Sequence, residues 1–322
     1  MTKNKIAPLL AGAAFALSAG LAAAQAYPTK PVRLIIPFPP GGSNDIVGRL
    51  IAQQLTDRLG KQAVVDNRGG AGGALGTELA ANSAADGYTI LIVSSAYAFN
   101  PSLYKLKYDP VKSFAPVALV GKGPNALTIY PKLGVNSVKE LIALAKAKPG
   151  QLNYASAGVG SFQHLGSAMF TMMAGINVVH VPFKGGGPAR ADVLAGNIQI
   201  CLGSLIQMIP NVNSGRLKML AVGSAKRVKA FPDVPTIAES GVPGYDASNW
   251  WGILAPAGTP QPIVARLSKE IMAIVDSPDI RKRFESQGAD AESMAPAEFG
   301  KFINAEMTKW ARVVKEAGIK AE

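Results

Sequence analysis

Cysteine and histidine are scarce in this sequence of 322 residues, which has Cys201 as its single cysteine and His164 and His180 as its two histidines. One cysteine excludes an intramolecular disulfide, so the fold must depend on its packed core for stability. The three residues are also well separated in sequence, and neither a metal cluster nor a Cys–His nucleophile pair has local support. We therefore expect no catalytic residue, no metal and no cofactor.

Acidic residues are also few: 21 Asp and Glu stand against 33 Lys and Arg, which gives a net charge of +12. The basic residues are scattered singly or in pairs, without the clusters and interleaved aromatics typical of nucleic-acid binding, so we expect no nucleic-acid partner. A positive surface field raises the rate at which a protein meets anions, in a salt-dependent way. The charge therefore favours a small anionic solute as the partner.

Long apolar runs are absent after the first 26 residues, so we expect no later segment to span a membrane. The N-terminal stretch has two lysines, an apolar run over 6–21 and an A-x-A pattern ending at Ala26, which predict a signal peptide at 1–26 cleaved before Tyr27. A membrane anchor is the alternative, but the run falls short of the roughly 20 apolar residues that a span needs. We expect the mature chain to reside in the periplasm.

From Pro31 onward, short β-branched runs alternate with stretches of helical periodicity, which is typical of strands and crossover helices in a mostly parallel sheet. The predicted strands are 32–37, 63–66, 89–93, 152–155, 178–181, 198–202 and 218–222. The predicted helices are 46–59, 138–147, 263–275, 280–285 and 297–314. Ser137 and Glu140 form a capping box at the start of the second of these helices.

This order of elements predicts an α/β protein with two lobes. Roughly 300 residues lie near the size at which one core divides into two. We expect the chain to cross between lobes near 121–125 and again near 246–251. Lobe 1 would then comprise 27–124 and 251–322, and lobe 2 would comprise 125–250, with a ligand cleft between them.

Two glycine-rich loops that open helices are the strongest candidates for a binding site. The first follows the strand at 32–37 and supplies Phe38, Gly41, Gly42 and Asp45. The second follows the strand at 152–155 and supplies Ser156, Gly158, Gly160, Ser161 and His164. Free N–H groups at a helix N-terminus bind anions. An ordinary βα turn explains either loop alone, but two such loops facing across a cleft would hold a carboxylate.

Other polar and aromatic residues follow predicted strands, where α/β sheets bind ligands. These candidates are Ser94, Ser95, Lys184, Ser204 and Trp251. Each has an ordinary alternative: the lysine can be an exposed loop residue, and one of the tryptophans at 250–251 is expected in the core. His180 lies inside an apolar strand pattern, which favours a structural role.

A nucleotide site is not supported. No G-x-x-x-x-G-K-[ST] spacing occurs, and the glycines at 69–76 match a dinucleotide fingerprint only superficially because Leu75 stands where its third glycine belongs. A tight turn into a helix that packs close to the sheet explains these glycines better.

Ordered motifs run through nearly all of the chain after the leader. They include Pro37-Phe38-Pro39-Pro40-Gly41-Gly42 with Asp45, Asp86-Gly87-Tyr88-Thr89, His180-Val181-Pro182, Pro232-Asp233-Val234-Pro235-Thr236 and Ala255-Pro256-Ala257-Gly258-Thr259-Pro260. In this order they resemble the periplasmic solute receptors of tripartite tricarboxylate transporters, the Bug family. The resemblance implies a periplasmic-binding-protein (Venus flytrap) fold, and a monomer that delivers its solute to membrane permease subunits.

The resemblance also implies how the ligand is held: carboxylates bind through loop amides, hydroxyls and bridging waters. Those roles fall on Gly41, Gly42, Ser94, Ser95, Gly158, Gly160 and Ser161, with Asp45 at the first helix start. The chain departs from the family at Gly203, where many relatives have an aspartate, and at Phe183, where a tyrosine is common. Both departures make the pocket more apolar or roomier, so we expect an aromatic or longer-chain carboxylate rather than a polar amino acid.

Two alternatives to a transport receptor stay open. A sensory protein that docks to a membrane kinase shares every sequence feature described above, because only the docking surface would differ. A secreted hydrolase or isomerase would depend on the carboxylates Asp45 and Asp66, for which capping or loop bracing is a sufficient explanation.

Overall fold

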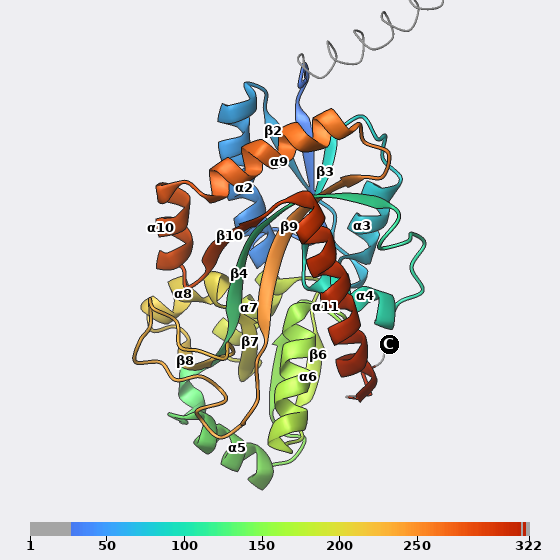
Figure 1. The fold of residues 1–322 in the computed structure, drawn as a ribbon. Helices are drawn as coiled ribbons and strands as arrows, with labels where there is room; N and C mark the ends of the chain where they lie inside the picture. The colour runs from blue at the N-terminus through green and yellow to red at the C-terminus, as the bar shows by residue number, and fades with distance from the viewer. Residues whose placement is uncertain (1–26, 317, 320–322) are drawn as a thin grey trace, which may run out of the picture.

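Two α/β lobes that share one long strand make up the protein (Figure 1). The computed structural model describes residues 27–316, 318 and 319, so the predicted leader lies outside the described residues. The strands are β1 Val32–Ile36, β2 Ala63–Asn67, β3 Thr89–Ser94, β4 Phe114–Ile129, β5 Asn153–Ser156, β6 Val179–Pro182, β7 Ile200–Ser204, β8 Lys218–Val222, β9 Ser248–Pro256 and β10 Asp290–Met294. The helices are α2 Ser43–Leu59, α3 Ala74–Ala81, α4 Ala96–Leu103, α5 Val138–Ala147, α6 Phe162–Ala174, α7 Gly186–Leu194, α8 Leu205–Asn213, α9 Gln261–Val275, α10 Pro278–Ser286 and α11 Pro296–Glu316.

The first lobe is built on the strand order β2-β1-β3-β9-β4, with β10 also paired to β4. β1 runs parallel to β2 and β3, and β9 runs antiparallel to β3. Alternate residues of β1 serve opposite faces: Leu34 and Ile36 join the core with α2 and α9, whereas Ile35 joins the core on the α4 and α11 side. A parallel sheet covered on both faces needs such continuous apolar strands.

The second lobe repeats this plan. β5 runs parallel to β6 and β7, and β4 pairs antiparallel with β7 and β8. Val193 and Met208, from α7 and α8, belong to one core of this lobe, while Leu141 and Leu165, from α5 and α6, belong to another. The capping box is present, since Ser137 Oγ accepts a hydrogen bond from the Glu140 N–H (3.2 Å).

The long strand β4 connects the lobes. It pairs with β9 as far as Pro124 and with β7 and β8 from Asn125 onward. This exchange of partners supports the boundary after residue 124, which stays a prediction. β9 begins its pairing at Ser248, slightly before the predicted return at 251. Figure 1 shows β4 and β9 descending side by side through the middle of the molecule.

All seven predicted strands are present within two residues of the expected bounds, and the five predicted helices within three. The strands β4, β9 and β10 were not expected. Pro116, Gly121, Gly123 and Pro124 interrupt the strand pattern of β4, and its register with β9 shifts between Pro116 and Ala118 and again near Gly121. Proline and glycine are tolerated in strands mainly at such irregularities. Over the described part of the chain, no helix combines the length and apolar character that a bilayer crossing requires.

Candidate functional site

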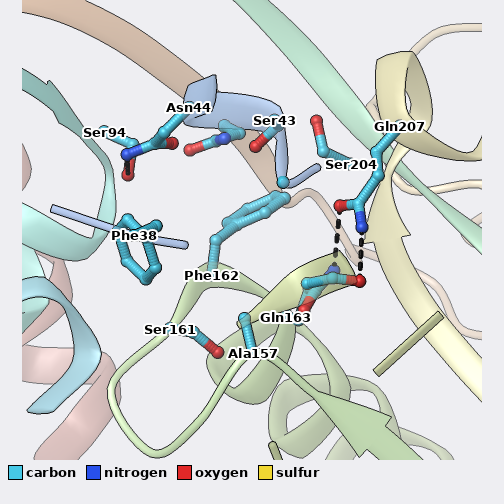
Figure 2. Close-up of a pocket in the computed structure, with 13 residues that line it drawn as sticks. Phe38, Ser43, Asn44, Ser94, Ala157, Ser161, Phe162, Gln163, Ser204 and Gln207 are labelled. Carbon is cyan, nitrogen blue, oxygen red and sulfur yellow. Dashed lines mark hydrogen bonds between the residues drawn. The ribbon is translucent and has the colours of Figure 1, made fainter. Parts of the chain in front are cut away.

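The candidate site is a pocket between the lobes, at the C-terminal ends of the parallel strands (Figure 2). Loops after β1, β3, β5, β6 and β7 reach it, together with the start of β9. This is where parallel α/β sheets bind ligands. The space among its lining residues, counted out to the mouth, is about 390 Å³. The pocket is lined by Phe38, Gly42, Ser43, Asn44, Ser94, Ala157, Ser161, Phe162, Gln163, Gly186, Ser204, Gln207 and Asn249.

The described residues that line this pocket include no Lys, Arg, Asp, Glu or His. Four helices begin there instead: Gly42, Ser161 and Ser204 are the N-caps of α2, α6 and α8, and Gly186 is the first residue of α7. The first N–H groups of a helix have no acceptor within it, and the helix dipole places partial positive charge at this end. The pocket is therefore suited to bind an anion even though no cationic side chain is among its described lining residues.

On the side of the first lobe, Asn44 and Ser94 form a buried polar pair. Asn44 Nδ2 donates to Ser94 Oγ (3.3 Å), and both side chains are at most 4% exposed. Because Ser94 accepts this bond, its own hydroxyl proton is free to be donated to a ligand.

Asn249 has its amide orientation fixed by Ser95. Asn249 Oδ1 accepts from the Ser95 N–H (3.3 Å) and from the Ser95 hydroxyl. A backbone N–H can only donate, so the atom facing it must be the amide oxygen. The NH2 group of Asn249 is thus the end left to meet a ligand.

On the side of the second lobe, Ser161 caps α6, because its Oγ accepts from the His164 N–H (3.2 Å). The Ser161 hydroxyl proton is then available to the pocket. Phe162 follows in the first turn, and its ring lies between the lobes opposite Phe38 (Figure 2). The two aromatic rings can pack against the apolar part of an organic acid, and the helix N-termini can bind its carboxylate.

Gln163 and Gln207 line the same side and are linked. Gln207 Nε2 donates to the Gly186 carbonyl (2.6 Å), and Gln163 Nε2 donates to Gln207 Oε1 (3.3 Å), as the dashed lines in Figure 2 show. Ser204 occupies the N-cap position of α8, yet its side chain makes no capping bond.

Asp45 braces the first loop from behind the pocket. The Gly41 N–H donates to its Oδ2 (3.0 Å), and Arg49 Nε and Asn67 Nδ2 donate to its Oδ1 (both 2.9 Å). Burial alone would raise the pKa of Asp45, but these three bonds outweigh it and hold the pKa below its ordinary value. Because the Asp45 carboxylate already accepts these three hydrogen bonds, we assign it a structural role.

The second loop rests on three stacked rings. The rings of Tyr154 and His180 are 4.9 Å apart and those of His180 and His164 are 4.3 Å apart, all nearly parallel. Ser156 Oγ lies 2.6 Å from His180 Nε2, and the Gly160 N–H donates to His164 Nδ1 (3.3 Å). Burial lowers the pKa of each histidine to about 4, so both rings are neutral at pH 7.

An open groove adjoins the pocket on the other side of Phe38. Gly158, Phe183 and Lys184 line it on one lobe, and the glycine-rich segment 69–73 lines it on the other. Phe183, one of the two departures from the family pattern, therefore lies at this groove.

Among the residues that the structure places, two hydrogen bonds join the lobes beside the pocket. Tyr104 Oη donates to the Val159 carbonyl (2.8 Å), and Arg190 Nη1 lies 3.4 Å from the Gly41 carbonyl that accepts from it. The loop that starts α7 is also tight against the first lobe: a Cβ added at Gly185 would lie 2.1 Å from Pro39 Cγ. The lobes are therefore in contact around the pocket.

The structure separates the predicted site residues into groups. Phe38, Gly42, Ser94, Ser161 and Ser204 line the pocket, and Gly158 and Lys184 line the adjoining groove. Behind these lie the residues that shape the loops, which are Gly41, Asp45, Ser95, Ser156, Gly160 and His164. The N–H groups of Gly41 and Gly160 are already donated within their loops.

Trp251 does not wall the pocket, which corrects the expectation for this residue. β9 is paired on both sides, by β3 and β4, so its side chains enter the two helix layers. Trp251 is fully buried with its ring against Phe284 of α10, and Trp250 packs on the opposite core against Phe299.

Five polar pocket residues were not among the predicted site residues: Ser43, Asn44, Gln163, Gln207 and Asn249. Gln163 follows the capping serine of α6, which is a weak signal, and Gln207 is in the first turn of a helix after β7. Asn249 is the second residue of β9, a strand that was not predicted from the sequence, so nothing local marks it as a pocket residue.

Two lobes sharing a strand, with an uncharged, helix-capped pocket between them, define the class of two-lobed solute-binding proteins. Within this class, the chain belongs to the tripartite tricarboxylate transporter family receptors, whose family model matches residues 47–319. It is a solute-binding receptor of this family, as the resemblance implied.

Individual relatives agree over almost the whole chain. Protein BugT of Bordetella pertussis is 40% identical over 312 residues, covering 95% of this chain and 96% of that protein. An R. palustris protein solved with adipate is 34% identical with a TM-score of 0.90, covering 92% of this chain and 100% of that one. MatC from Rhodopseudomonas palustris, solved with malate, is 31% identical with a TM-score of 0.83, covering 89% and 100%.

Proposed function

We propose that this receptor is exported to the periplasm, captures a small organic carboxylate between its lobes and delivers it unchanged to the permease subunits of a tripartite tricarboxylate-type transporter. The observation that carries the proposal is the pocket itself, where the N-termini of four helices converge and none of the lining residues in the described part of the chain is charged. Two related structures hold dicarboxylates, adipate and malate, which supports the same ligand class here.

Binding without reaction fits the groups that are present. Cys201 is fully buried in the core, and burial raises the pKa of its thiol to about 12, which leaves no thiolate at neutral pH. The two histidines are held in a ring stack and do not line the pocket. Asp45 and Asp66 are paired with arginines, so neither is a free general base.

The walls favour an acid with an apolar part over an amino acid. Phe38 and Phe162 supply aromatic surface, and none of the described residues that line the pocket has a carboxylate to pair with an ammonium group. Gly203 lies behind Gln163 and is not itself among the lining residues: a Cβ there would lie 3.0 Å from Gln163 Nε2 and 2.1 Å from Met208 Cε. A larger residue at position 203 would approach the Gln163 side chain. In this chain the methyl group of Met208 occupies the space where that Cβ would lie.

A thermal-shift screen of the leaderless protein, unfolded and refolded to remove carried-over ligand, tests the proposal. The panel contains mono-, di- and tricarboxylates, aromatic acids and amino acids. Ligand in hundredfold excess over its dissociation constant stabilises the native state by about 2.7 kcal/mol. A clear shift with one carboxylate class and none with amino acids is the expected result, and no shift with any acid would contradict it.

Delivery and export are tested separately. Cells lacking the receptor should fail to take up the identified acid, and uptake should return with the wild-type chain but not with a leaderless one. Mass spectrometry of the periplasmic protein should give a chain that begins at Tyr27. Uptake that is unaffected by the deletion would contradict the transport role while leaving binding intact.

A further inference from the structure

Arg190 is a half-buried cation that has no acidic partner among the described residues. It follows by four residues Gly186, which begins α7 and lines the pocket. Helix side chains lean towards the N-terminus of their helix, so the Arg190 side chain is directed to the pocket end of α7. A cation that is partly removed from water without a protein counter-ion favours an anion nearby.

The guanidinium of Arg190 crosses the cleft to the first glycine-rich loop. Its Nη1 donates to the Gly41 carbonyl of the first lobe (3.4 Å) and to the Gln207 carbonyl of its own lobe (3.0 Å). Burial lowers the pKa of Arg190, but an arginine remains charged at neutral pH. A positive charge therefore lies just behind the pocket, although none of its described lining residues carries one.

Gly41 is held at both of its backbone polar groups. Its N–H donates to Asp45 Oδ2 (3.0 Å) within the first lobe, and its carbonyl accepts from Arg190 of the second lobe. Its φ of +85° is in the left-handed region that favours glycine. These contacts fix the orientation of the peptide group that joins Gly41 to Gly42.

The same peptide group carries the Gly42 N–H. Gly42 lines the pocket, and its N–H has no acceptor among the described residues. A hydrogen bond to the carbonyl of a peptide group polarises that group and makes its N–H a stronger donor. The charge of Arg190 can thus act on an anion in the pocket through one peptide group, without touching the anion.

We propose that Arg190 is a positioning residue for the bound anion, which fixes and polarises the Gly41–Gly42 peptide group so that the Gly42 N–H donates more strongly to the ligand's carboxylate. Because the Gly41 carbonyl belongs to the other lobe, Arg190 strengthens anion binding only when the lobes are in contact. The inference rests on the proposed function, since it concerns how the same pocket holds its carboxylate.

Tyr104 provides a comparison, because it also makes a hydrogen bond that joins the lobes. Its hydroxyl donates to the Val159 carbonyl (2.8 Å), whose peptide group carries the Gly160 N–H. That N–H is already donated to His164 Nδ1 (3.3 Å). The Tyr104 bond can therefore hold the lobes together, but it does not strengthen a donor to the ligand.

Titration calorimetry with adipate and hexanoate, which have the same chain length but differ by one carboxylate, tests the inference. Arg190→Met removes the charge and keeps an apolar stem. We expect it to bind both acids at least about tenfold more weakly, as for the loss of a hydrogen bond to a charged group. Tyr104→Phe should lose less affinity. Arg216→Met is the control for charge, because Arg216 is exposed in the turn before β8, and its affinity should be unchanged.

A spectroscopic measurement follows the peptide group itself. The sequence has five Gly–Gly pairs, at 41–42, 69–70, 72–73, 185–186 and 186–187. Glycine labelled with 13C at the carbonyl and with 15N restricts an HNCO spectrum to these pairs, and Gly42→Ala, at an ordinary φ of −84°, assigns the first. Loss of the bond to the Gly41 carbonyl should move the 41–42 signal upfield in Arg190→Met, with or without ligand, while the 69–70 signal stays in place.

Arg190→Lys keeps the inference testable if the methionine variant does not fold. Lysine retains the positive charge but lacks the planar fork of the guanidinium. We expect weaker binding of both acids and an upfield shift of the 41–42 signal, each smaller than in Arg190→Met. Thermal unfolding of every variant checks that it is folded.

The outcomes separate three roles for Arg190. A loss of affinity confined to adipate would show that Arg190 pairs directly with a second carboxylate of the ligand. Equal losses in Arg190→Met and Tyr104→Phe, with an unmoved 41–42 signal, would show that Arg190 only joins the lobes. Either result, or wild-type affinity in Arg190→Met, overturns the inference and leaves the carboxylate receptor standing.

A common loss for both acids together with a moved 41–42 signal supports the inference. No binding of adipate, hexanoate or any acid of the thermal-shift panel to the wild-type chain would instead overturn the proposed function itself.

Discussion

Ser94 is the pocket hydroxyl whose role can be tested with the least disturbance. It accepts from Asn44 Nδ2, and its proton is free for the ligand. Ser94→Ala removes this donor but no backbone contact, so we expect the carboxylate to bind roughly ten- to hundredfold more weakly, the range for a hydrogen bond to a charged group. Titration calorimetry on the refolded protein measures the change.

The control for this variant is Ser83→Ala. Ser83 is a serine whose hydroxyl donates to the Leu79 carbonyl of its own chain segment, away from the pocket. Its substitution should leave affinity unchanged. If Ser94→Ala also leaves affinity unchanged, Ser94 belongs to the support of Asn44 and not to the ligand contacts.

At this scale the sequence indicates some pocket residues and not others. Serines at the N-cap positions of helices after strands, such as Ser161 and Ser204, are recognisable from the strand–loop–helix pattern alone. The side chains of Gln207 and Asn249 reach the pocket only through tertiary packing, which no local pattern records. Gly41 and Gly160 lie in the right loops, but only the structure reveals that their N–H groups are already used.

Among the structural elements, the histidine stack under the second loop makes stability depend on pH. Both histidines have a folded-state pKa of about 4 against an ordinary 6.5, so between these values the unfolded chain binds protons that the folded chain does not. The contribution of the two histidines to the free energy of unfolding is therefore fully present above about pH 6.5, and it is lost as the pH falls towards 4. We expect urea-unfolding midpoints to decline across this window.

The chain has only two histidines, which makes the test specific. His180→Phe should reduce the pH dependence from about two protons to about one. Acid groups such as Asp45, whose pKa is lowered, act separately, since their contribution is lost below the ordinary carboxyl pKa. An unchanged slope in His180→Phe would mean that this ring is protonated in the folded state.

The loop before α7 makes a close contact with the first lobe at Gly185. Gly185 has φ +134°, and a Cβ added there would lie 2.1 Å from Pro39 Cγ across the cleft. Gly185→Ala should therefore hold the lobes apart and weaken ligand binding at least about tenfold. The backbone strain should cost about 1–3 kcal/mol of stability, because φ +134° with ψ +165° is a conformation that is essentially restricted to glycine. Small-angle scattering with and without ligand measures the closure.

Gly215→Ala is the matched control, because Gly215 also has a positive φ (+70°) but nothing lies within 4 Å of an added Cβ. It should lose about 1–2 kcal/mol of stability from its left-handed backbone and keep full affinity. Equal affinity in the two variants would show that the contact with Pro39 is not needed for binding.

Helices and strands with one clear hydrophobic period were predictable from the sequence. The strand β4, which pairs in both lobes, was not. Lys218–Val222 and Val138–Ala147 match the expected bounds because hydrophobic spacing and a cap define them locally. β4 belongs to both lobes and changes partners along its length, and the prolines and glycines that permit its irregular register hide it from a pattern search.

For the whole molecule, the positive charge should act on the rate of capture. Without the two leader lysines, the net charge is still +10. Salt screens this field over about 10 Å at 0.1 M, while the buried donors of the pocket are screened much less. We expect the association rate for a dicarboxylate to fall several-fold between low and high salt, with the dissociation rate nearly constant.

Stopped-flow measurement of intrinsic tryptophan fluorescence follows both rates if closure changes the signal, and calorimetry at each salt concentration checks their ratio. Charge-neutral ethylene glycol, added at equal osmolality, controls for solvent effects. A salt effect confined to the dissociation rate would place the relevant charge inside the closed pocket, in conflict with its uncharged lining.

The uncharged pocket has an evolutionary consequence. Its grip on an anion depends largely on main-chain N–H groups at helix starts, which almost no single substitution can delete, since only proline lacks the group. The side chains around that grip can therefore vary one at a time while each intermediate still retains an acid. A receptor of this design can acquire new nutrients by gradual drift, because its recognition of negative charge is inherited with the fold.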